Sequence, residues 1–266
     1  MKTNAFAALV AAVLLTPAAH AGFVNGNFET GDASGWTTGG GYRGNELNST
    51  LDPVNYLPGG SNYNSSLNHS SIVTAGFDAN TGNNLNRVYS GNYSYRVEDT
   101  VTGGYASAIT QTVSNYQDSS IFFAWAAVLQ GAHGVNDAAT FKLTLTDLTS
   151  MSVLVNREYN AATTGSGVDS RFTYNASTGY YYTAWQVEQL TNLTLGHTYQ
   201  LSLLAADCEP TGHRGYVYLD GFGAVTPPVV DNGTVPEPGT LALLGGGLLG
   251  MTRLARRNGK VNVIAA

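Results

Sequence analysis

Short apolar runs alternate with polar clusters along most of this 266-residue chain. From Gly22 to the prolines at 227 and 228, β-branched and aromatic runs are separated by groups of Gly, Asn, Asp and Ser, and no stretch of a dozen residues keeps a helical 3.6-residue period. Strict alternation is clear where Phe141, Leu143 and Leu145 share one face. That pattern is typical of antiparallel strands with one buried face. We therefore expect strands at 93–97, 106–113, 121–129, 141–146, 152–155, 180–190, 197–205 and 216–222.

About eight strands joined by polar turns predict an all-β domain over residues 22–226, an antiparallel β-sandwich of jelly-roll type. Residues 37–87 differ, because they are rich in Gly, Asn, Ser and Tyr and poor in aliphatic side chains. A structureless loop of that length is uncommon inside a compact domain, so we expect short strands to interrupt it near residues 71–73. Residues 227–235 contain two prolines and predict a semi-extended linker.

The N-terminus carries an export signal. A positive Met1-Lys2 precedes an apolar helix at 5–15, Pro17 ends it, and Ala19-His20-Ala21 satisfies the small-x-small cleavage rule. We expect residues 1–21 to be a signal peptide that the general secretion machinery uses and signal peptidase removes. The mature protein would then begin at Gly22.

The C-terminus combines three features in a fixed order. Pro236-Glu237-Pro238 is followed by an uncharged, Gly-rich apolar run at 240–251, and then by Arg253, Arg256 and Arg257. Prolines on both sides of Glu237 keep the tripeptide extended and accessible, and the arginines would stay on the cytoplasmic side. The other interpretation is an ordinary C-terminal anchor. Its apolar core of about 15 residues is shorter than the ~20 that span a membrane comfortably.

Residues 236–257 resemble a PEP-CTERM sorting signal, the bacterial tag that an exosortase recognises. The resemblance implies a Gram-negative bacterium, transient insertion of a hydrophobic sorting helix into the inner membrane, and cleavage near Pro236–Pro238. The product would reach the cell surface or the extracellular matrix of a biofilm. Residues 258–266 depart from the pattern, because such signals usually stop at or near the arginines.

The net charge and the cysteine content limit the kinds of partner and of covalent cross-link that we expect. Removal of Lys2 and everything after Pro238 leaves seven of the 12 basic residues and all 18 acidic ones, a net charge of −11. Such a protein lacks the basic patch that nucleic acids or anionic lipids require, whereas neutral glycans and divalent cations are compatible partners. Cys208 is the only cysteine, so no intramolecular disulfide can form.

Three stretches are similar to galactose-binding-like, carbohydrate-binding jelly-roll domains. They are an opening strand at 23–32 with Gly35-Trp36, central strands at 108–113 and 121–126, and a closing strand at 216–222 that returns beside the first. The resemblance implies a structural calcium where first and last strands meet, with Glu29 and Asp220 as carboxylate ligands and Asp32 from the following turn. Otherwise these residues are polar groups on strand faces or caps of turns.

Aromatic residues in the same domain predict a sugar-stacking platform, with Trp36 and Tyr42 as the ligand-binding candidates. The competing interpretation places these rings in the core or in packed turns. Further rings with the same two interpretations are Tyr56, Tyr63 and Tyr180 to Tyr182.

The segment 207–216 brings Cys208 and His213 into one loop before the last strand. They could act as nucleophile and base, or bind zinc, although zinc needs more ligands than these two provide. The third interpretation is a turn that Pro210 and Gly212 bend. The remaining mature histidines, His69, His133 and His197, show no metal-ligand spacing, and we expect surface or strand positions for them.

The sequence as a whole predicts an exported, exosortase-processed surface or matrix protein that is non-catalytic and binds carbohydrate. The alternative is an extracellular hydrolase that uses the Cys208/His213 loop or unidentified carboxylates. A plain surface protein without a ligand is the third possibility.

Overall fold

The computed structural model describes residues 22–131, 133–163 and 167–224. The chain divides into two compact units, residues 1–229 and 230–266. The predicted signal peptide, linker, sorting signal and tail lie outside the described residues. No helix among the described residues has the length and apolarity needed to cross a membrane.

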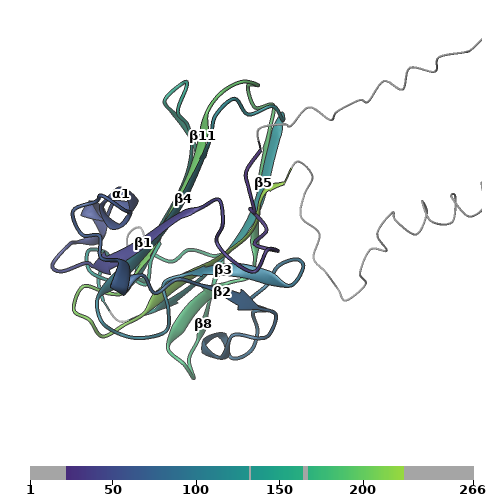
Figure 1. Ribbon diagram of the computed structural model, residues 1–266. Helices are drawn as coiled ribbons and strands as arrows, with labels where there is room; N and C mark the ends of the chain where they lie inside the picture. Colours follow the sequence, from purple (N-terminus) through teal and green to yellow (C-terminus); the bar gives the residue numbers. More distant parts are fainter. Residues whose placement is uncertain (1–21, 132, 164–166, 225–266) are drawn as a thin grey trace, which may run out of the picture. The chain divides into compact units, whose positions relative to one another are not determined.

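Two antiparallel sheets form the described part (Figure 1). The five-stranded sheet contains, in spatial order, β1 (Thr37–Tyr42), β4 (Tyr105–Val113), β11 (Tyr199–Ala206), β6 (Thr140–Asp147) and β7 (Ser152–Asn160). The seven-stranded sheet contains β2 (Ser71–Thr74), β3 (Tyr93–Val97), β12 (Gly215–Ala224), β5 (Ser120–Gln130), β9 (Tyr180–Thr183) and β8 (Phe172–Asn175), and β10 (Gln186–Thr191) also pairs with β5. The predicted fold class, an all-β antiparallel β-sandwich of jelly-roll type, is confirmed.

Helical structure is confined to short connecting segments. The helix α1 (Pro53–Tyr56) and the 3-10 helices at Asn48–Thr50 and Ser65–Leu67 lie between β1 and β2, and a further 3-10 helix at Ala79–Thr81 follows β2. Residues 37–87 therefore contain two strands and four helical turns, and the strand expected near residues 71–73 is confirmed as β2.

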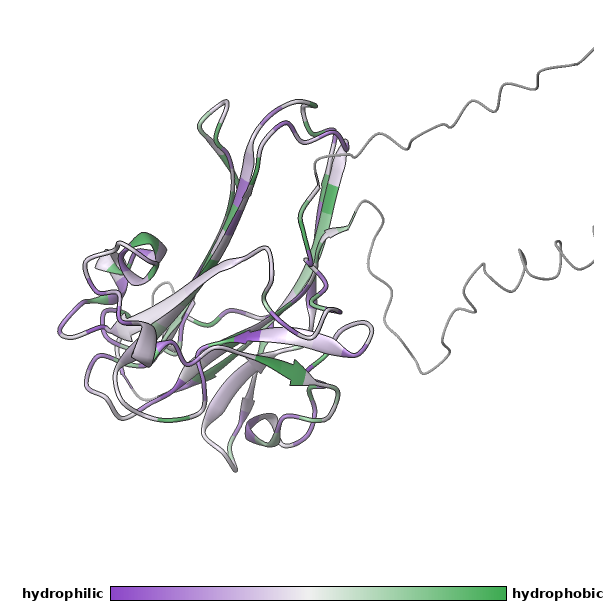
Figure 2. Cartoon of the chain, viewed as in Figure 1, coloured by the Kyte–Doolittle hydropathy of each residue, from purple (hydrophilic) through white to green (hydrophobic). Residues whose placement is uncertain are grey.

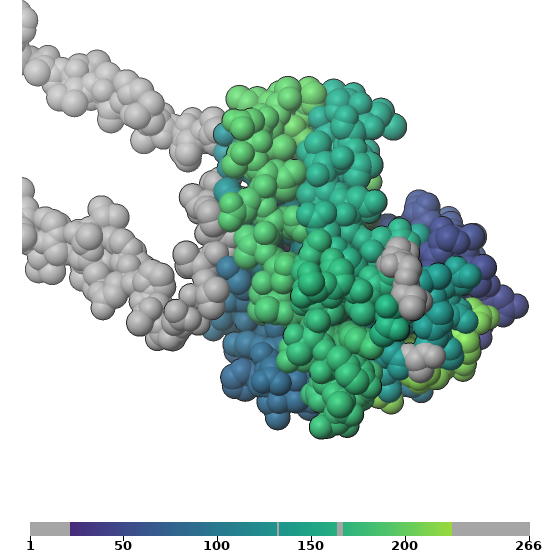
Figure 3. All heavy atoms as spheres, turned by 180° about the vertical axis from the view of Figure 1, so that it is seen from behind, coloured from purple at the N-terminus to yellow at the C-terminus, as the bar shows by residue number. Residues whose placement is uncertain are grey.

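The main core lies between the sheets and follows the alternation seen in the sequence. Phe141, Leu143 and Leu145 of β6 are fully buried and pack with the inward residues of β11 and with Trp125 of β5. Burial of such side chains stabilises the fold by about 1.5–3 kcal/mol each. Figure 2 shows hydrophobic residues along β2 and β5, and Figure 3 shows later segments of the chain, teal to green, covering the opposite side.

A third layer covers half of the outer face of the five-stranded sheet. Leu51, Tyr56 and Leu57 pack on small residues of β4 and on Leu204 of β11. β1 can run beneath this layer because it carries Gly39, Gly40 and Gly41: a Cβ on any of them would overlap a backbone atom of residues 56–68. The rest of the outer face stays uncovered.

Three of the expected strands differ in the structure. The strand expected at 152–155 is longer, because β7 continues to Asn160. Residues 23–32 form turns rather than an opening strand. The side-chain amide of Gln111 holds this segment through both backbone polar groups of Val24, and the N–H of Phe222 donates to the carbonyl of Gly26, so the segment still lies beside the closing strand β12. The strand expected at 180–190 is divided into β9 and β10, which pair with different halves of β5.

Candidate functional site

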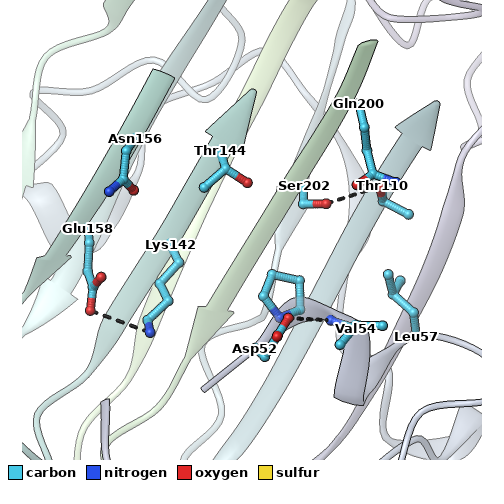
Figure 4. A pocket seen from close by; sticks show the side chains of 11 residues that line it. Asp52, Val54, Leu57, Thr110, Lys142, Thr144, Asn156, Glu158, Gln200 and Ser202 are labelled. Carbon is cyan, nitrogen blue, oxygen red and sulfur yellow. Dashed lines mark hydrogen bonds and ion pairs between the residues drawn. The ribbon is translucent and has the colours of Figure 1, made fainter. Parts of the chain in front are cut away.

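A cavity of about 350 Å³ opens on the uncovered outer face of the five-stranded sheet (Figure 4). Its floor consists of side chains that alternate with the core residues on four neighbouring strands. They are Thr110 of β4, Gln200 and Ser202 of β11, Lys142 and Thr144 of β6, and Asn156 and Glu158 of β7. We call this site the sheet groove.

The wall of the sheet groove is the short helix α1. Asp52 begins the helix, because its carboxylate accepts the N–H of Val54 at 3.0 Å and Pro53 occupies the first turn. Tyr56 anchors the helix: its ring is fully buried, and its hydroxyl donates to Glu46 at 2.7 Å. Val54 and Leu57 consequently face the cavity, and Val54 stays 59% exposed, which gives the wall an apolar surface.

The floor of the groove offers both donors and acceptors. Gln200 donates to the Thr112 hydroxyl at 2.9 Å, which leaves its amide oxygen as an acceptor. The Thr110 hydroxyl donates to the Leu201 carbonyl at 2.6 Å and lies 3.2 Å from the Ser202 hydroxyl. Lys142 and Glu158 form an ion pair of 3.5 Å across β6 and β7. An apolar wall beside mixed donors and acceptors suits a ligand rich in hydroxyl groups.

A second cavity, of about 390 Å³, lies by the outer face of the other sheet. Three of its lining residues are arginines, Arg87, Arg96 and Arg214, and we call it the arginine pocket. Asp78 also lines it and accepts hydrogen bonds of 2.8 Å from the hydroxyls of both Tyr216 and Tyr218.

The predicted calcium ligands Glu29 and Asp220 bind the same loop, residues 89–93. Asp220 is fully buried, and its Oδ2 accepts the N–H groups of Tyr89 and Ser90, each at 3.0 Å. The other oxygen, Oδ1, is buried without a hydrogen-bond partner in the described part of the chain. Glu29 accepts the N–H groups of Asn92 at 2.9 Å and Tyr93 at 3.0 Å. Burial raises the pKa of Asp220 to about 7.

Asp32 serves its own turn rather than that loop. Its carboxylate accepts the N–H of Ser34 at 3.0 Å and the hydroxyl of Thr30 at 2.7 Å. Hydrogen bonding by the side chains of Ser34 and Thr30 and by the Ser34 N–H lowers the pKa of Asp32. The structure therefore brings Glu29 and Asp220 to one loop and shows Asp32 in a different set of contacts. Oε2 of Glu29 accepts the side-chain amide of Asn92 at 2.9 Å, so Oδ1 of Asp220 is the one oxygen of these two carboxylates without a hydrogen-bond partner among the described residues. A hard carboxylate oxygen of this kind is a ligand that calcium uses.

The predicted aromatic platform divides between core and surface. Trp36 is only 9% exposed, stacks on Phe28 at 5.4 Å between ring centroids, and donates from Nε1 to the Asn25 carbonyl. These contacts favour the interpretation that places the ring of Trp36 in the core, and its stacking on a sugar stays a prediction. Tyr42 is 51% exposed and makes a T-shaped ring contact with Tyr105. Tyr42 does not line the sheet groove.

Cys208 lies between β11 and β12 with no exposed surface, and burial raises its pKa. Its Sγ lies 3.7 Å from Nδ1 of His213 and accepts the N–H groups of Gly212 and His213. A nucleophilic cysteine needs a lowered pKa and open access, so this environment does not favour the hydrolase alternative.

The sequence analysis did not identify the residues of the sheet groove as a candidate site. Gln200, Asn156 and Thr110 occupy the solvent-facing positions of alternating strands, and every half-buried strand carries polar residues there. What distinguishes the groove residues is that they lie together beside the helix α1. This arrangement depends on the pairing of four strands, so the sequence alone does not indicate it.

Comparison with known proteins identifies the C-terminal segment. Residues 234–257 match the PEP-CTERM protein-sorting motif, which confirms the predicted sorting signal. No curated protein matches the chain in sequence.

Solved structures with a similar strand arrangement include TmCBM61 in complex with β-1,4-galactotriose, at a TM-score of 0.39 and 12% identity, covering 76% of this chain and 96% of that one. The K2 cleaved adhesin domain of Lys-gingipain has a TM-score of 0.31 and 12% identity, covering 71% and 87%. The family 11 carbohydrate-binding module from Clostridium thermocellum, in complex with a mixed-linked tetrasaccharide, has a TM-score of 0.29 and 8% identity, covering 74% and 90%.

Proposed function

We propose that this chain is a surface or extracellular-matrix protein that binds polysaccharide in the sheet groove and performs no catalysis. The C-terminal motif indicates an exported protein that is processed at the membrane. Final delivery to the cell surface or to a biofilm matrix belongs to the proposal, together with signal peptidase, exosortase and extracellular polysaccharide as partners.

The observation that carries the binding function is the composition of the sheet groove. Seven hydrogen-bonding side chains from four strands face one apolar wall formed by Val54 and Leu57. Sugars present hydroxyl groups around their edge and C–H groups on their faces, so they can use both surfaces at once. A cavity of about 350 Å³ also falls within the size range of small-molecule sites. The rigid sheet holds these groups in place before the ligand arrives, which limits the entropy lost on binding.

The contacts of the groove carboxylates favour binding over hydrolysis. Glycoside hydrolysis needs two carboxyl groups that act on one bond as acid and as base or nucleophile. Here Glu158 pairs with Lys142, and Asp52 caps α1. Both carboxylates are engaged in structural contacts within the protein, so neither is positioned as an acid or a base for a bound sugar.

Calcium is part of the proposal as a structural ion. Asp220 on β12 and Glu29 in the N-terminal segment both accept backbone N–H groups from the loop 89–93, and Asp220 Oδ1 has no described partner. A calcium ion at Asp220 would satisfy this oxygen and offset the buried charge. Removal of the ion would then loosen the N-terminal segment without altering the sheet groove.

Polysaccharide binding is tested with the mature protein purified after export, screened on an array of bacterial and plant glycans. The proposal predicts saturable binding to hydroxyl-rich polysaccharides and no increase in reducing ends during long incubation. New reducing ends that depend on Glu158 or Cys208 would establish the hydrolase alternative, and absence of binding to every glycan would contradict the proposed function.

A further inference from the structure

His133, Cys208 and His213 form a three-residue cluster although His133 is far from the others in sequence. His133 belongs to the connection between β5 and β6, whereas Cys208 and His213 belong to the connection between β11 and β12. One ligand-type atom from each residue lies within 4.8 Å of the other two. The rings of His133 and His213 are 4.6 Å apart between centroids and inclined by 72°. The structure thus supplies the third ligand that the sequence lacked.

The separation between Cys208 and His213 matches metal coordination. Tetrahedral zinc with Zn–S of about 2.3 Å and Zn–N of about 2.0–2.1 Å places sulfur and nitrogen roughly 3.6 Å apart. The observed separation between Cys208 Sγ and His213 Nδ1 is 3.7 Å. A direct hydrogen bond from a ring nitrogen to sulfur would also be possible at this distance, but it would leave His133 unexplained.

One residue of the cluster has a buried polar atom without a hydrogen-bond partner. His133 Nε2 is buried and has no hydrogen-bond partner in the described chain. Asp137 lies on the same connection as His133, and its Oδ1 is also buried without a hydrogen-bond partner among the described residues. The backbone carbonyl of Asp137 accepts the N–H of Glu209, the residue after Cys208. A buried polar atom without a partner costs about 1–3 kcal/mol. A bound cation would remove that cost for His133 directly.

Two backbone N–H groups would stabilise a negative charge on the sulfur of Cys208. The backbone N–H groups of Gly212 at 3.1 Å and His213 at 3.0 Å both donate to Sγ. The turn is closed by the Cys208 N–H, which donates to the His213 carbonyl at 2.8 Å. Two N–H donors stabilise a thiolate, which is the form that coordinates metal. A metal ion that binds this sulfur takes the place of the thiol proton.

We propose that His133, Cys208 and His213 bind one Zn²⁺ ion. Two imidazoles and one thiolate give a tetrahedral site with a fourth position for water or a nearby carboxylate. The ion would tie the β5–β6 connection to the β11–β12 connection. A chain with a single cysteine cannot make such a link through an intramolecular disulfide.

The test is the metal content of the mature exported protein after incubation with one equivalent of Zn²⁺ and desalting. We expect one zinc per chain, and cobalt substitution should give thiolate-to-cobalt charge-transfer absorption. His133→Ala changes a half-exposed loop residue, so the variant should fold and bind zinc at least 10-fold more weakly. His197→Gln is the matched control, because that imidazole pairs with Asp147 outside the cluster. Folded wild type without zinc, or full zinc binding by His133→Ala, would overturn the assignment.

A second, independent observation concerns the arginine pocket. Three of the seven basic residues expected in the mature chain line it, although the net charge of that form is −11. No ion pair joins Arg87, Arg96 or Arg214 to a carboxylate within the described residues. The guanidinium of Arg87 makes no hydrogen bond to a described residue, and the Nε atoms of Arg87 and Arg214 are buried without partners.

Arg96 and Arg214 are oriented by their neighbours. Arg96 donates from Nε to the Glu98 carbonyl at 3.0 Å and lies over the Tyr216 ring, and Arg214 donates to the Tyr180 hydroxyl at 3.1 Å. Asp78 is the carboxylate of the pocket, and it is engaged by two tyrosine hydroxyls. Three guanidinium groups around one carboxylate leave an excess of positive charge in the pocket. Guanidinium forks match carboxylate geometry.

Resting on the proposed function, we infer that the arginine pocket binds the carboxylate of an acidic polysaccharide. The test compares an oligosaccharide of uronic acids with its neutral counterpart. We expect the acidic ligand to bind at least 10-fold more tightly in low salt, and Arg87→Gln to abolish the difference. Arg171→Gln makes the same charge change outside the pocket and should preserve it.

Equal affinity for the acidic and neutral ligands would overturn the inference and leave polysaccharide binding in the sheet groove intact. Retention of the preference in Arg87→Gln would overturn it as well. Failure of both ligands and of every array glycan would instead contradict the proposed function itself.

Discussion

The backbone N–H of Tyr89 donates a hydrogen bond of 3.0 Å to Oδ2 of Asp220, although the two residues stand 131 positions apart. This contact attaches the loop 89–93 to the closing strand β12. It also fixes the orientation of the carboxylate, so that Oδ1 is the oxygen without a hydrogen-bond partner among the described residues.

Asp220→Asn separates the role of the hydrogen bonds from that of the charge. The amide oxygen of Asn can accept the same N–H groups, and the substitution removes a buried charge. We expect the thermal midpoint without calcium to be unchanged or higher. Wild type should gain stability on addition of calcium, and the variant should not. Identical midpoints of wild type in calcium and in EDTA would rule out the structural ion.

Asp147 gives the domain an acid-sensitive contact. Burial by itself raises the pKa of Asp147, but hydrogen bonds from His197, Ser150 and Thr149 outweigh it and lower the pKa to about 2. The folded-state pKa is below the ordinary 3.8, so the stabilisation is present above pH 3.8 and is lost as the pH falls toward 2.

Urea denaturation between pH 2 and 6 measures this contribution. Wild type should lose stability steeply below pH 3.8, and Asp147→Asn should show a shallower loss. At neutral pH the substitution should cost about 1–3 kcal/mol, because it weakens charge-assisted hydrogen bonds. Parallel curves for the two proteins would show that Asp147 does not contribute to acid unfolding.

A bidentate ion pair joins the edges of the two sheets. Arg157 of β7 donates to both oxygens of Glu188 in β10 at 2.7 and 2.8 Å, and Trp125 donates to Glu188 at 3.0 Å. Glu188→Gln should destabilise the protein by about 1.5–3 kcal/mol in chemical denaturation. Glu158→Gln removes a longer and more exposed pair with Lys142, so it should cost less than about 1 kcal/mol. Equal effects would contradict this account of sheet closure.

We predict that processing depends on the Pro-Glu-Pro tripeptide. Glu237→Ala in the natural host should leave the protein in the membrane fraction with its C-terminal segment attached, because the exosortase would not recognise it. Intact-mass measurement of the two fractions gives the result. Normal release of the variant, with the same C-terminus as wild type, would exclude Glu237 from the recognition signal.

The strand pattern was predictable because alternation reports which face of a strand is buried. β3, β4, β5, β6, β11 and β12 lie within one or two residues of the expected ranges at each end. β1 was missed, because Gly39–Gly41 lack the side chains on which a strand pattern depends. Side chains are excluded at these three positions because the third layer lies directly above them. That contact joins different segments of the chain, so no local sequence pattern indicates it.

The candidate sites were predictable only in part, because they depend on contacts between segments that are distant in sequence. Glu29 and Asp220 do converge on one loop, although Asp32 does not share it. Trp36 was a candidate for stacking on a ligand, whereas in the structure its ring packs against Phe28 and Phe222. His133 joins Cys208 and His213 only because β5 and β12 are paired, so sequence spacing carries no trace of the cluster.

Isothermal titration with the extracellular polysaccharide of the producing organism tests the central claim most directly. Gln200→Ala removes a groove side chain, and Gln189→Ala makes the same change on an exposed position of β10. We predict that Gln200→Ala weakens binding about two- to 13-fold, the loss expected for a net hydrogen bond of about 0.5–1.5 kcal/mol, while Gln189→Ala binds like wild type. Equal affinities for all three proteins, or no heat of binding for wild type, would contradict a polysaccharide site in the sheet groove.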